Sequence, residues 1–462
     1  MKIKTLLFLY LAATLPNYTF SQSEDEAMLR KTFNEALTNG QSYQMLDYLS
    51  NNIGARLSGS PEAAAAVEWS RQQMMRLGFD TVYLQEVMVP HWVRGKKEVA
   101  RIVNAKSGTI DLKVCALGNS VGTGPDGLAA SVVEVKNFDE LKNLGRKNVE
   151  GKIVFYNRPM DPTLINTFGA YGGAVDQRVN GPSEAARLGA KGVIVRSMAS
   201  NNDDIPHTGT LVYDESAGRI PAIAVSTNDA NLLSRLLKDD ANLKVYMETH
   251  CEMLPDVLSY NVIGEMKGNR YPNEYIVVGG HLDSWDVGDG SHDDGAGCVQ
   301  SIEAIRILMT LGYKPQRTLR AVMFMNEENG LRGGLKYAAQ ATANKETHIA
   351  AIESDRGGFT PKGFTISGSE KAKSALMSWK PLFAPYDIYD FGKPGGGADI
   401  GPLGESGTAL IGFLPDSQRY FTLHHTDADT FETVDKRELE MGAGSMAALV
   451  YLIDKYGMDG KN

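Results

Sequence analysis

A stretch rich in glycine and aspartate, residues 279–297, constrains the fold of this chain more than any other segment. It reads GGHLDSWDVGDGSHDDGAG and contains two histidines and five aspartates. The apolar run Tyr275–Val278 before it predicts a buried strand, and the pattern from Cys298 to Leu311 after it predicts a helix. Surface loops also use aspartate and glycine freely, but in open α/β sheets the loop after a strand lies at the carboxyl edge, where ligands bind. The stretch therefore predicts a binding site on an α/β fold.

Other predicted strands also end in acidic or imidazole side chains. Strands that alternate with helices predict a mostly parallel sheet with helices on both faces, so these strand ends share one cleft. Carboxylates held close together repel and are partly desolvated, and a cation is the natural compensation. Imidazole mixed with carboxylate suits Zn²⁺ better than Ca²⁺ or Mg²⁺. The strand ends concerned follow residues 317–325, 349–352 and 408–414 and carry Glu327, Glu328, Asp355, His424 and His425.

In two of these motifs, the spacing of the residues predicts different roles for the two side chains. His281 and Asp283 alternate along an extended segment, so one can bind a metal while the other orients it. Glu327 and Glu328 are neighbours that point apart at a strand end, so one can bind metal while the other faces water as a general base. Taken alone, the second pair is also typical of a solvated loop, and only the apolar strand before it favours the site.

These motifs resemble those of the co-catalytic two-zinc exopeptidases, a family that includes bacterial zinc aminopeptidases and glutamate carboxypeptidases. The resemblance extends over essentially the whole chain after its first 22 residues. It implies that two Zn²⁺ ions activate a water molecule for peptide-bond hydrolysis. The residues that carry it are His281, Asp283, Asp293, Asp294, Gly295, Glu327, Glu328, Asp355, His425, Thr426, Asp429 and Thr430.

The resemblance also implies a set of metal ligands. His281 and Asp355 would bind one zinc ion. Glu328 and His425 would bind the other, and Asp293 would bridge the two. In this interpretation the neighbouring histidine and aspartate of the 279–297 stretch match no ligand position.

The remaining site residues would serve catalysis or substrate binding. Asp283 would hold His281 in the tautomer needed for ligation, and Glu327 would act as general base and then as general acid. His424 stands where many relatives have a tyrosine, and it could donate a hydrogen bond to the developing oxyanion or serve only in packing. Asp399, in the glycine-rich run 392–404, is a substrate-binding candidate with a structural loop as the alternative.

Composition and the pattern of predicted strands and helices divide the chain into segments. Residues 23–114 and 256–462 would form the catalytic domain, and residues 115–255 an inserted β-rich domain that resembles a protease-associated domain. Within the insert, only His207 is a candidate to reach the catalytic cleft, and an ordinary loop histidine is the alternative. The family resemblance also implies a homodimer.

The N-terminus has the pattern of a secretory signal peptide over residues 1–22. Lys2 and Lys4 precede an apolar run from Thr5 to Leu15, which is about half of the ~20 residues needed to span a bilayer. We therefore expect an exported protein, periplasmic or secreted, without a membrane span. Three cysteines allow one disulfide at most, and whether Cys115 and Cys251 pair is open.

The net charge of the chain limits the classes of partner that it can bind. The formal net charge of −9 and the absence of a basic run argue against nucleic-acid binding. We expect a peptidase that acts on short peptides or dipeptides with free termini, and its side-chain preference stays open. Two alternatives keep the fold: a single-zinc glutaminyl cyclase that transfers an acyl group, and a receptor that has lost the metals.

Overall fold

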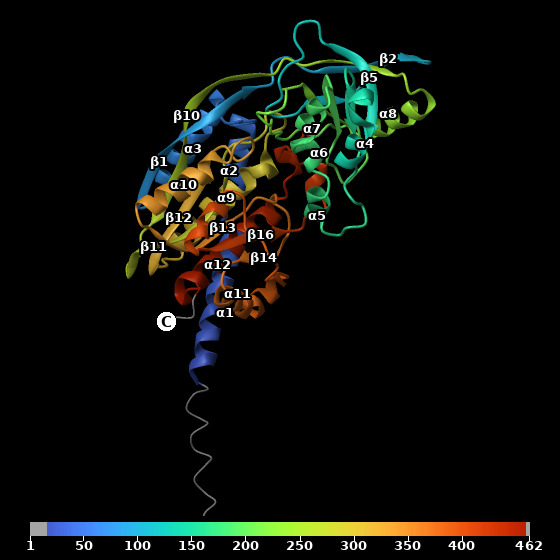
Figure 1. Ribbon diagram of the computed structural model, residues 1–462. Helices are drawn as coiled ribbons and strands as arrows, with labels where there is room; N and C mark the ends of the chain where they lie inside the picture. Colours follow the sequence, from blue (N-terminus) through green and yellow to red (C-terminus); the bar gives the residue numbers. More distant parts are fainter. Residues whose placement is uncertain (1–15, 459–462) are drawn as a thin grey trace, which may run out of the picture.

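The computed structural model describes residues 16–458, and these form two units, each built around an eight-stranded sheet (Figure 1). Residues 1–15, which hold most of the expected signal peptide, lie outside the described residues. The two-unit arrangement confirms the α/β fold class, with helices packed around both sheets.

The first sheet has a parallel centre and antiparallel edges. β12, β11, β13 and β16 are parallel neighbours in that order, as the alternation of strands and helices predicts. β10 and β1 extend one side antiparallel, and β14 joins the other side antiparallel, so the sheet is mixed at its edges. Its strands are β1 (Thr81–Val93), β10 (Glu252–Met266), β11 (Tyr271–His281), β12 (Arg317–Phe324), β13 (Thr347–Glu353), β14 (Pro361–Ser367), β15 (Asp390–Phe391) and β16 (Ala409–Pro415).

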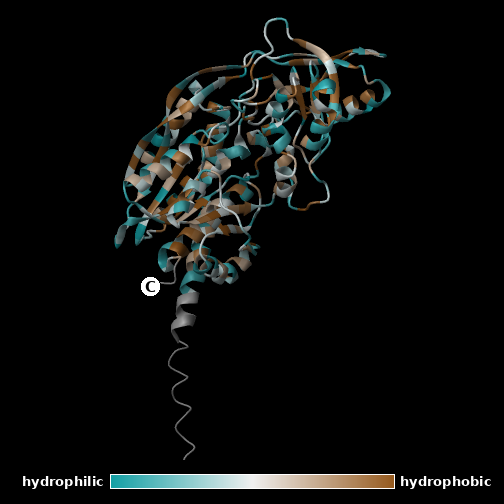
Figure 2. Cartoon of the chain, in the orientation of Figure 1, coloured by the Kyte–Doolittle hydropathy of each residue, from teal (hydrophilic) through white to brown (hydrophobic). Residues whose placement is uncertain are grey.

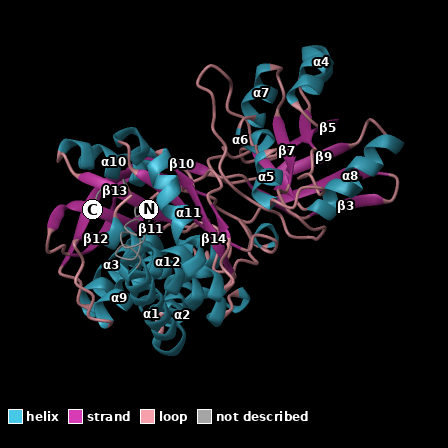
Figure 3. Cartoon of the chain, turned by 90° about the horizontal axis from the view of Figure 1, so that it is seen from below, coloured by secondary structure: helices cyan, strands magenta, loops and turns pink. Residues whose placement is uncertain are grey.

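Helices cover both faces of this sheet because its central strands are apolar on both sides. In β12, Leu319 and Met323 point into one hydrophobic core, while Val322 and Phe324 point into another. Figure 3 shows α1, α2, α9 and α12 gathered on one side of the strands, and Figure 2 shows brown, apolar stretches along the strands. The first core is covered by α1 (Pro16–Asn39), α2 (Ser42–Tyr48), α3 (Pro61–Leu77), α9 (Ala296–Thr310), α11 (Glu370–Phe383) and α12 (Lys436–Tyr456), and the second by α10 (Arg332–Ala343).

The second unit is a separate sheet with the strand order β3-β2-β9-β5-β6-β7-β8-β4. It holds the strands expected for the insert, but it also takes in residues 99–112, which the sequence placed with the catalytic segment. Its elements are β2 (Val99–Ala105), β3 (Gly108–Leu112), β4 (Val114–Ala116), β5 (Leu128–Val135), α4 (Phe138–Val149), β6 (Ile153–Tyr156), α5 (Thr167–Gly172), α6 (Asp176–Val179), α7 (Gly181–Arg187), β7 (Gly192–Arg196), β8 (Ala222–Val225), α8 (Thr227–Asp239) and β9 (Lys244–Glu248).

Two chain segments connect the two units, and side chains of the first unit pack into a hydrophobic core of the second. The chain leaves the first unit after β1 and returns through β10, and these long strands pair with each other up to Val93 and Glu252. Phe359, Tyr420 and Phe421 of the first unit pack into the hydrophobic core of the second. Helices α5 and α6 therefore lie over the carboxyl edge of the first sheet (Figure 1). Within residues 16–458, no helix combines the length and apolarity needed to cross a bilayer.

Candidate metal centre

The carboxyl ends of the parallel strands meet at one carboxylate, Asp293. The Nε2 atom of His281, at the end of β11, lies 3.3 Å from Asp293 Oδ1 and 3.5 Å from Asp355 Oδ1. The Nε2 atom of His425 lies 3.2 Å from the other oxygen of Asp293 and 3.2 Å from Glu328 Oε2. Asp293 thus sits between two imidazoles, each of which also faces a second carboxylate. The structure brings together all five residues that the sequence singled out as metal ligands.

The chemistry of this cluster fits metal ions. Ligand atoms of His281, Asp293 and Asp355 lie within 4.8 Å of one another, and the same holds for those of Asp293, His424 and His425. The two groups share Asp293, whose Oδ2 is buried and accepts no hydrogen bond. A buried oxygen without a donor is costly unless a cation is bound nearby. Nitrogen and carboxylate donors together suit zinc.

The electrostatics of the cluster point the same way. Burial and the charge of Asp293 raise the pKa of the Glu328 carboxyl to about 7. Burial opposes the charging of His425, but Glu328 and Asp293 outweigh it and raise the pKa of His425 to about 10. Protons therefore collect where negative charge is in excess. A bound cation would take over the compensation that these protons provide.

Asp283 orients its neighbours with two different groups. Its main-chain carbonyl oxygen accepts a hydrogen bond of 2.8 Å from His281 Nδ1, which leaves Nε2 free to face Asp293. Its carboxylate accepts the backbone N–H groups of Asn326, at 2.6 Å, and Glu327, at 3.1 Å. The sequence predicted that Asp283 orients His281; in the structure its main-chain carbonyl oxygen makes that contact, and its carboxylate holds the loop that carries Glu327.

Glu327 lies beside the ligand cluster and stays partly exposed. Burial, followed by repulsion from Asp355 and Glu328, raises the pKa of its carboxyl well above the usual range. The turn before it places Asn326 at φ 74°, in the left-handed region, where its side-chain amide donates to Ser58 Oγ at 2.8 Å. The backbone of Glu327 is thus held beside the ligand cluster, and its carboxylate is not one of the close ligand pairs.

Two buried residues shape the 279–297 loop. The guanidinium of Arg56 donates to the carbonyl oxygens of Leu282, at 2.6 Å, and Gly290, at 2.9 Å. The carboxylate of Asp429 accepts the backbone N–H of Asp293 at 3.0 Å. Asp429 belongs to one of the motifs that carry the family resemblance, whereas Arg56 lies more than 200 residues before the loop. Their contacts show how the loop turns Asp293 toward both imidazoles.

The second unit reaches the two histidines of the last motif. His207 Nδ1 donates to the carbonyl oxygen of His424 at 2.8 Å, and Thr208 N–H donates to the carbonyl oxygen of His425 at 2.9 Å. Arg178 Nη1 lies 3.5 Å from His425 Nδ1. His207 therefore does reach the site, although it contacts the main chain rather than the cleft. The sequence could not predict the contacts of Arg178 and Thr208 with His425, since His425 lies more than 200 residues from each of them.

His424 packs face to face with His425, with ring centroids 3.5 Å apart, and its Nε2 lies 3.6 Å from Asp293 Oδ2. Tyr420 is buried with its ring centroid 5.1 Å from that of His424. Burial, and then the charge of Asp293 and Asp355, raises the pKa of the Tyr420 phenol well above its usual range, so it stays a hydrogen-bond donor. The sequence analysis missed Tyr420 because it sought a tyrosine directly before the distal histidine.

Asp399 lies behind the pocket wall. It is 1% exposed, and neither carboxylate oxygen has a hydrogen-bond partner among the described residues. Burial and the nearby charges of Glu353 and Glu327 raise the pKa of its carboxyl well above the usual range. The wall itself is held by Glu353, whose carboxylate accepts the backbone N–H groups of Ala398, at 2.7 Å, and Ile400, at 2.9 Å. Substrate contact by Asp399 stays a prediction.

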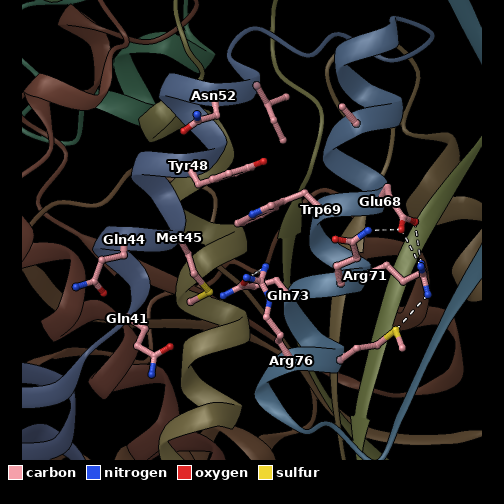
Figure 4. A pocket seen from close by; sticks show the side chains of 14 residues that line it. Gln41, Gln44, Met45, Tyr48, Asn52, Glu68, Trp69, Arg71, Gln73 and Arg76 are labelled. Atoms are coloured by element: carbon pink, nitrogen blue, oxygen red, sulfur yellow. Dashed lines mark hydrogen bonds and ion pairs between the residues drawn. The ribbon is translucent and has the colours of Figure 1, made fainter.

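A cavity of about 410 Å³ opens directly beside Asp355. Its lining residues come from the end of β13, the glycine-rich loop and α5 of the second unit: Glu353, Asp355, Arg356, Gly396, Gly397, Ala398 and Phe168. A different hollow, of about 1160 Å³, lies between α2 and α3 (Figure 4). Tyr48 stacks on Trp69 there with ring centroids 5.9 Å apart, and none of the ligand-cluster residues lines it. The smaller cavity is therefore the one that belongs to the site.

Comparison with known proteins agrees with this geometry. Residues 261–450 match the profile of Peptidase family M28. Carboxypeptidase Q of Bos taurus is 35% identical over 413 residues, which cover 89% of this chain and 85% of the relative. The chain belongs to peptidase family M28. The resemblance to two-zinc exopeptidases is thereby confirmed. The match to carboxypeptidase Q also extends to segments outside the metal motifs.

Solved structures of a peptidase M28 precursor and of a zinc aminopeptidase have the same fold. A peptidase M28 precursor from Shewanella amazonensis superposes with a TM-score of 0.89 at 32% identity, covering 94% of this chain and 97% of the other. A zinc aminopeptidase from Bacillus subtilis superposes with a TM-score of 0.64 at 19% identity, covering 92% and 98%. Together these matches support a metallopeptidase. They do not favour the cyclase or the receptor alternative.

Proposed function

We propose that this M28 protein is an exported exopeptidase that hydrolyses short peptides or dipeptides at a site holding two zinc ions. The observation that carries the proposal is the position of Asp293 between His281 and His425. Asp355 and Glu328 complete the two ligand groups. Two zinc ions held there would lower the pKa of a water molecule and polarise the substrate carbonyl.

The protein's own groups would supply the proton transfers. Glu327 accepts a proton from the attacking water as the new C–O bond forms at the scissile carbonyl. It then passes that proton to the leaving nitrogen as the C–N bond breaks. Asp283 keeps Glu327 in place through its backbone N–H at 3.1 Å. Tyr420 and His424 are the neutral donors available to the developing oxyanion.

The proposal includes the organisation of the chain. A signal peptide at residues 1–22 precedes the catalytic segments 23–114 and 256–462, and the insert at 115–255 is of the protease-associated kind. The separate second sheet supports an insert, although it begins at β2 rather than at residue 115. Dimerisation follows only from the family resemblance.

The test is the metal content of the purified mature protein, together with dipeptide hydrolysis before and after chelation. We expect two zinc ions per chain and hydrolysis that stops on chelation and returns with added zinc. One zinc ion per chain without hydrolysis would favour an acyl-transferring cyclase. Hydrolysis unaffected by metal removal would refute the di-zinc mechanism.

A further inference from the structure

Arg356 is an unpaired cation in the wall of the cavity beside the candidate metal centre. It directly follows Asp355 in sequence and lines the same cavity of about 410 Å³. Its guanidinium lies over the ring of Phe168, 4.3 Å from the centroid. Within residues 16–458, Arg356 has neither a hydrogen bond nor an ion pair. Its charge is therefore free to meet a ligand.

Other buried arginines among the described residues have polar partners: Arg56 donates to main-chain carbonyl oxygens, and Arg196 donates to two asparagine side chains. Arg94 pairs with Glu98 and Asp286, and Arg320 pairs with Glu265 and Glu346. A partly buried guanidinium without polar partners loses hydration, and only the contact with the Phe168 ring offsets that loss. Arg356 thus departs from the pattern in the rest of the fold, and it does so at the mouth of the proposed active site.

The surroundings of Arg356 leave no internal anion for it. A neighbouring hollow of about 530 Å³ shares Phe168 and Arg356 with the cavity, and it holds two lysines. Those lysines are paired: Lys362 with Asp416 and Lys393 with Asp390. In the cavity itself, the carboxylate of Glu353 is turned to the backbone N–H groups of the glycine-rich loop, and Asp355 faces His281.

The cavity has room for one residue of a substrate. Gly396, Gly397 and Ala398 form a wall of minimal side chains, and a Cβ atom at Gly397 would collide with Glu353. Phe168, from α5 of the second unit, closes the opposite wall. Because Asp355 and Arg356 line the same cavity, one substrate residue in it can meet the guanidinium while its neighbouring carbonyl lies beside the ligand cluster.

We propose that Arg356 determines specificity by binding the free carboxylate of the residue that leaves after cleavage. The planar guanidinium fork matches a carboxylate through two parallel N–H···O bonds, which an ammonium or a neutral group cannot reproduce. The inference rests on the proposed peptidase function and deepens it. It makes the preferred substrate a dipeptide, or a longer peptide cut at its last bond.

The experiment compares one dipeptide, Ala-Leu, with its C-terminal amide, Ala-Leu-NH₂, on the zinc-loaded mature protein. We expect the wild type to prefer the free acid. Arg356→Met should lower kcat/KM for the free acid by about 10- to 100-fold, mainly through KM, as expected for the loss of a charge-assisted hydrogen-bonded pair. The same variant should change kcat/KM for the amide by less than about 3-fold, and Arg356→Lys should fall between.

Arg419→Met is the matched control. Arg419 also lies over a phenylalanine, 4.7 Å from the centroid of Phe359, but it pairs with Glu438 and does not line the cavity. Its removal should leave both substrates unaffected. Zinc content and melting temperature, measured for each variant, separate a folding defect from a loss of recognition.

Each outcome decides the assignment. An equal loss on acid and amide, or no loss on the acid, overturns the role of Arg356 and leaves the peptidase proposal standing. A zinc-loaded wild type that cleaves neither substrate overturns both. Should Arg356→Met fail to fold, inhibition of the wild type decides: leucine must inhibit amide cleavage at least 10-fold more strongly than leucinamide, and equal inhibition refutes the proposal.

Discussion

At the scale of single residues, the proposed mechanism assigns metal binding and proton transfer to different groups. Asp283 illustrates how one residue serves both. Its carbonyl oxygen orients His281, and its carboxylate holds the backbone of Glu327. The proposed ligand and the proposed base, which follow different strands, are thus set relative to each other by one side chain and its peptide group. Such direct coupling keeps both within the narrow geometry that catalysis needs.

Replacing the proposed base tests this separation. Glu327→Gln keeps the size and the backbone contact to Asp283 but cannot accept a proton. We expect kcat to fall by about 10²- to 10⁴-fold, the usual contribution of a general base. Zinc content, measured on the same sample, should stay at the wild-type level because Glu327 is not one of the close ligand pairs. Full activity of this variant would contradict the assignment.

At the scale of elements, strand β13 carries both the site and a buried titratable group. Its first half holds His348, whose Nε2 accepts a hydrogen bond of 2.8 Å from the Tyr337 hydroxyl. The ring of Tyr275 stacks on it with centroids 5.4 Å apart. Burial and the charge of Arg320 lower the pKa of His348 to about 4, against a weaker opposing effect of Glu346.

This pKa predicts how β13 responds to acid. The unfolded chain takes up a proton at His348 near pH 6.5, whereas the folded chain does so only near pH 4. Above pH 6.5 His348 therefore costs no stability, and below it the free energy of unfolding declines as the pH falls toward 4. The cost amounts to about 3 kcal/mol at pH 4. Urea unfolding at pH 7 and at pH 4 measures how much the free energy of unfolding falls with acid. In His348→Gln this fall should be smaller than in the wild type by about that amount. An unchanged difference would show that another group dominates the acid response.

At the scale of the whole molecule, the candidate metal centre lies where the two units meet. The second unit contributes His207 and Thr208 to the main chain of His424 and His425, and the first unit contributes Tyr420 to the core of the second. Ions bound at the centre would therefore stabilise the folded molecule by mass action, in addition to serving catalysis.

Metal removal should accordingly lower the melting temperature of the entire protein. Without a cation, the buried carboxylates of Asp293 and Glu328 repel each other, and the folded state loses the binding free energy. We expect calorimetry to show a shift of several degrees on chelation, reversed by zinc. The inactive Glu327→Gln protein should shift equally, since its ligands are intact. Equal melting temperatures with and without chelator would contradict this prediction.

Local sequence signals were sufficient for parts of the fold and for the motif residues. Pro61 and Gly78 mark the bounds of α3, because proline fits the first helical turn and Gly78 ends the helix at φ 86°. The five predicted ligands come together because each lies just beyond a strand end or in the loop after it, and parallel strands bring such ends to one edge. Short spacings along the chain are enough to predict these features.

Only the tertiary structure decided what joins those motifs. His207 and His424 are 217 residues apart, and nothing in either segment indicates their contact. The assignment of residues 99–112 to the second sheet depends on pairing with β9, and the cavity at Arg356 depends on α5 lying over β13. The physical reason is common to all three. A strand pattern or a charged side chain specifies what it can bind, whereas its partner is chosen by packing across distant parts of the chain.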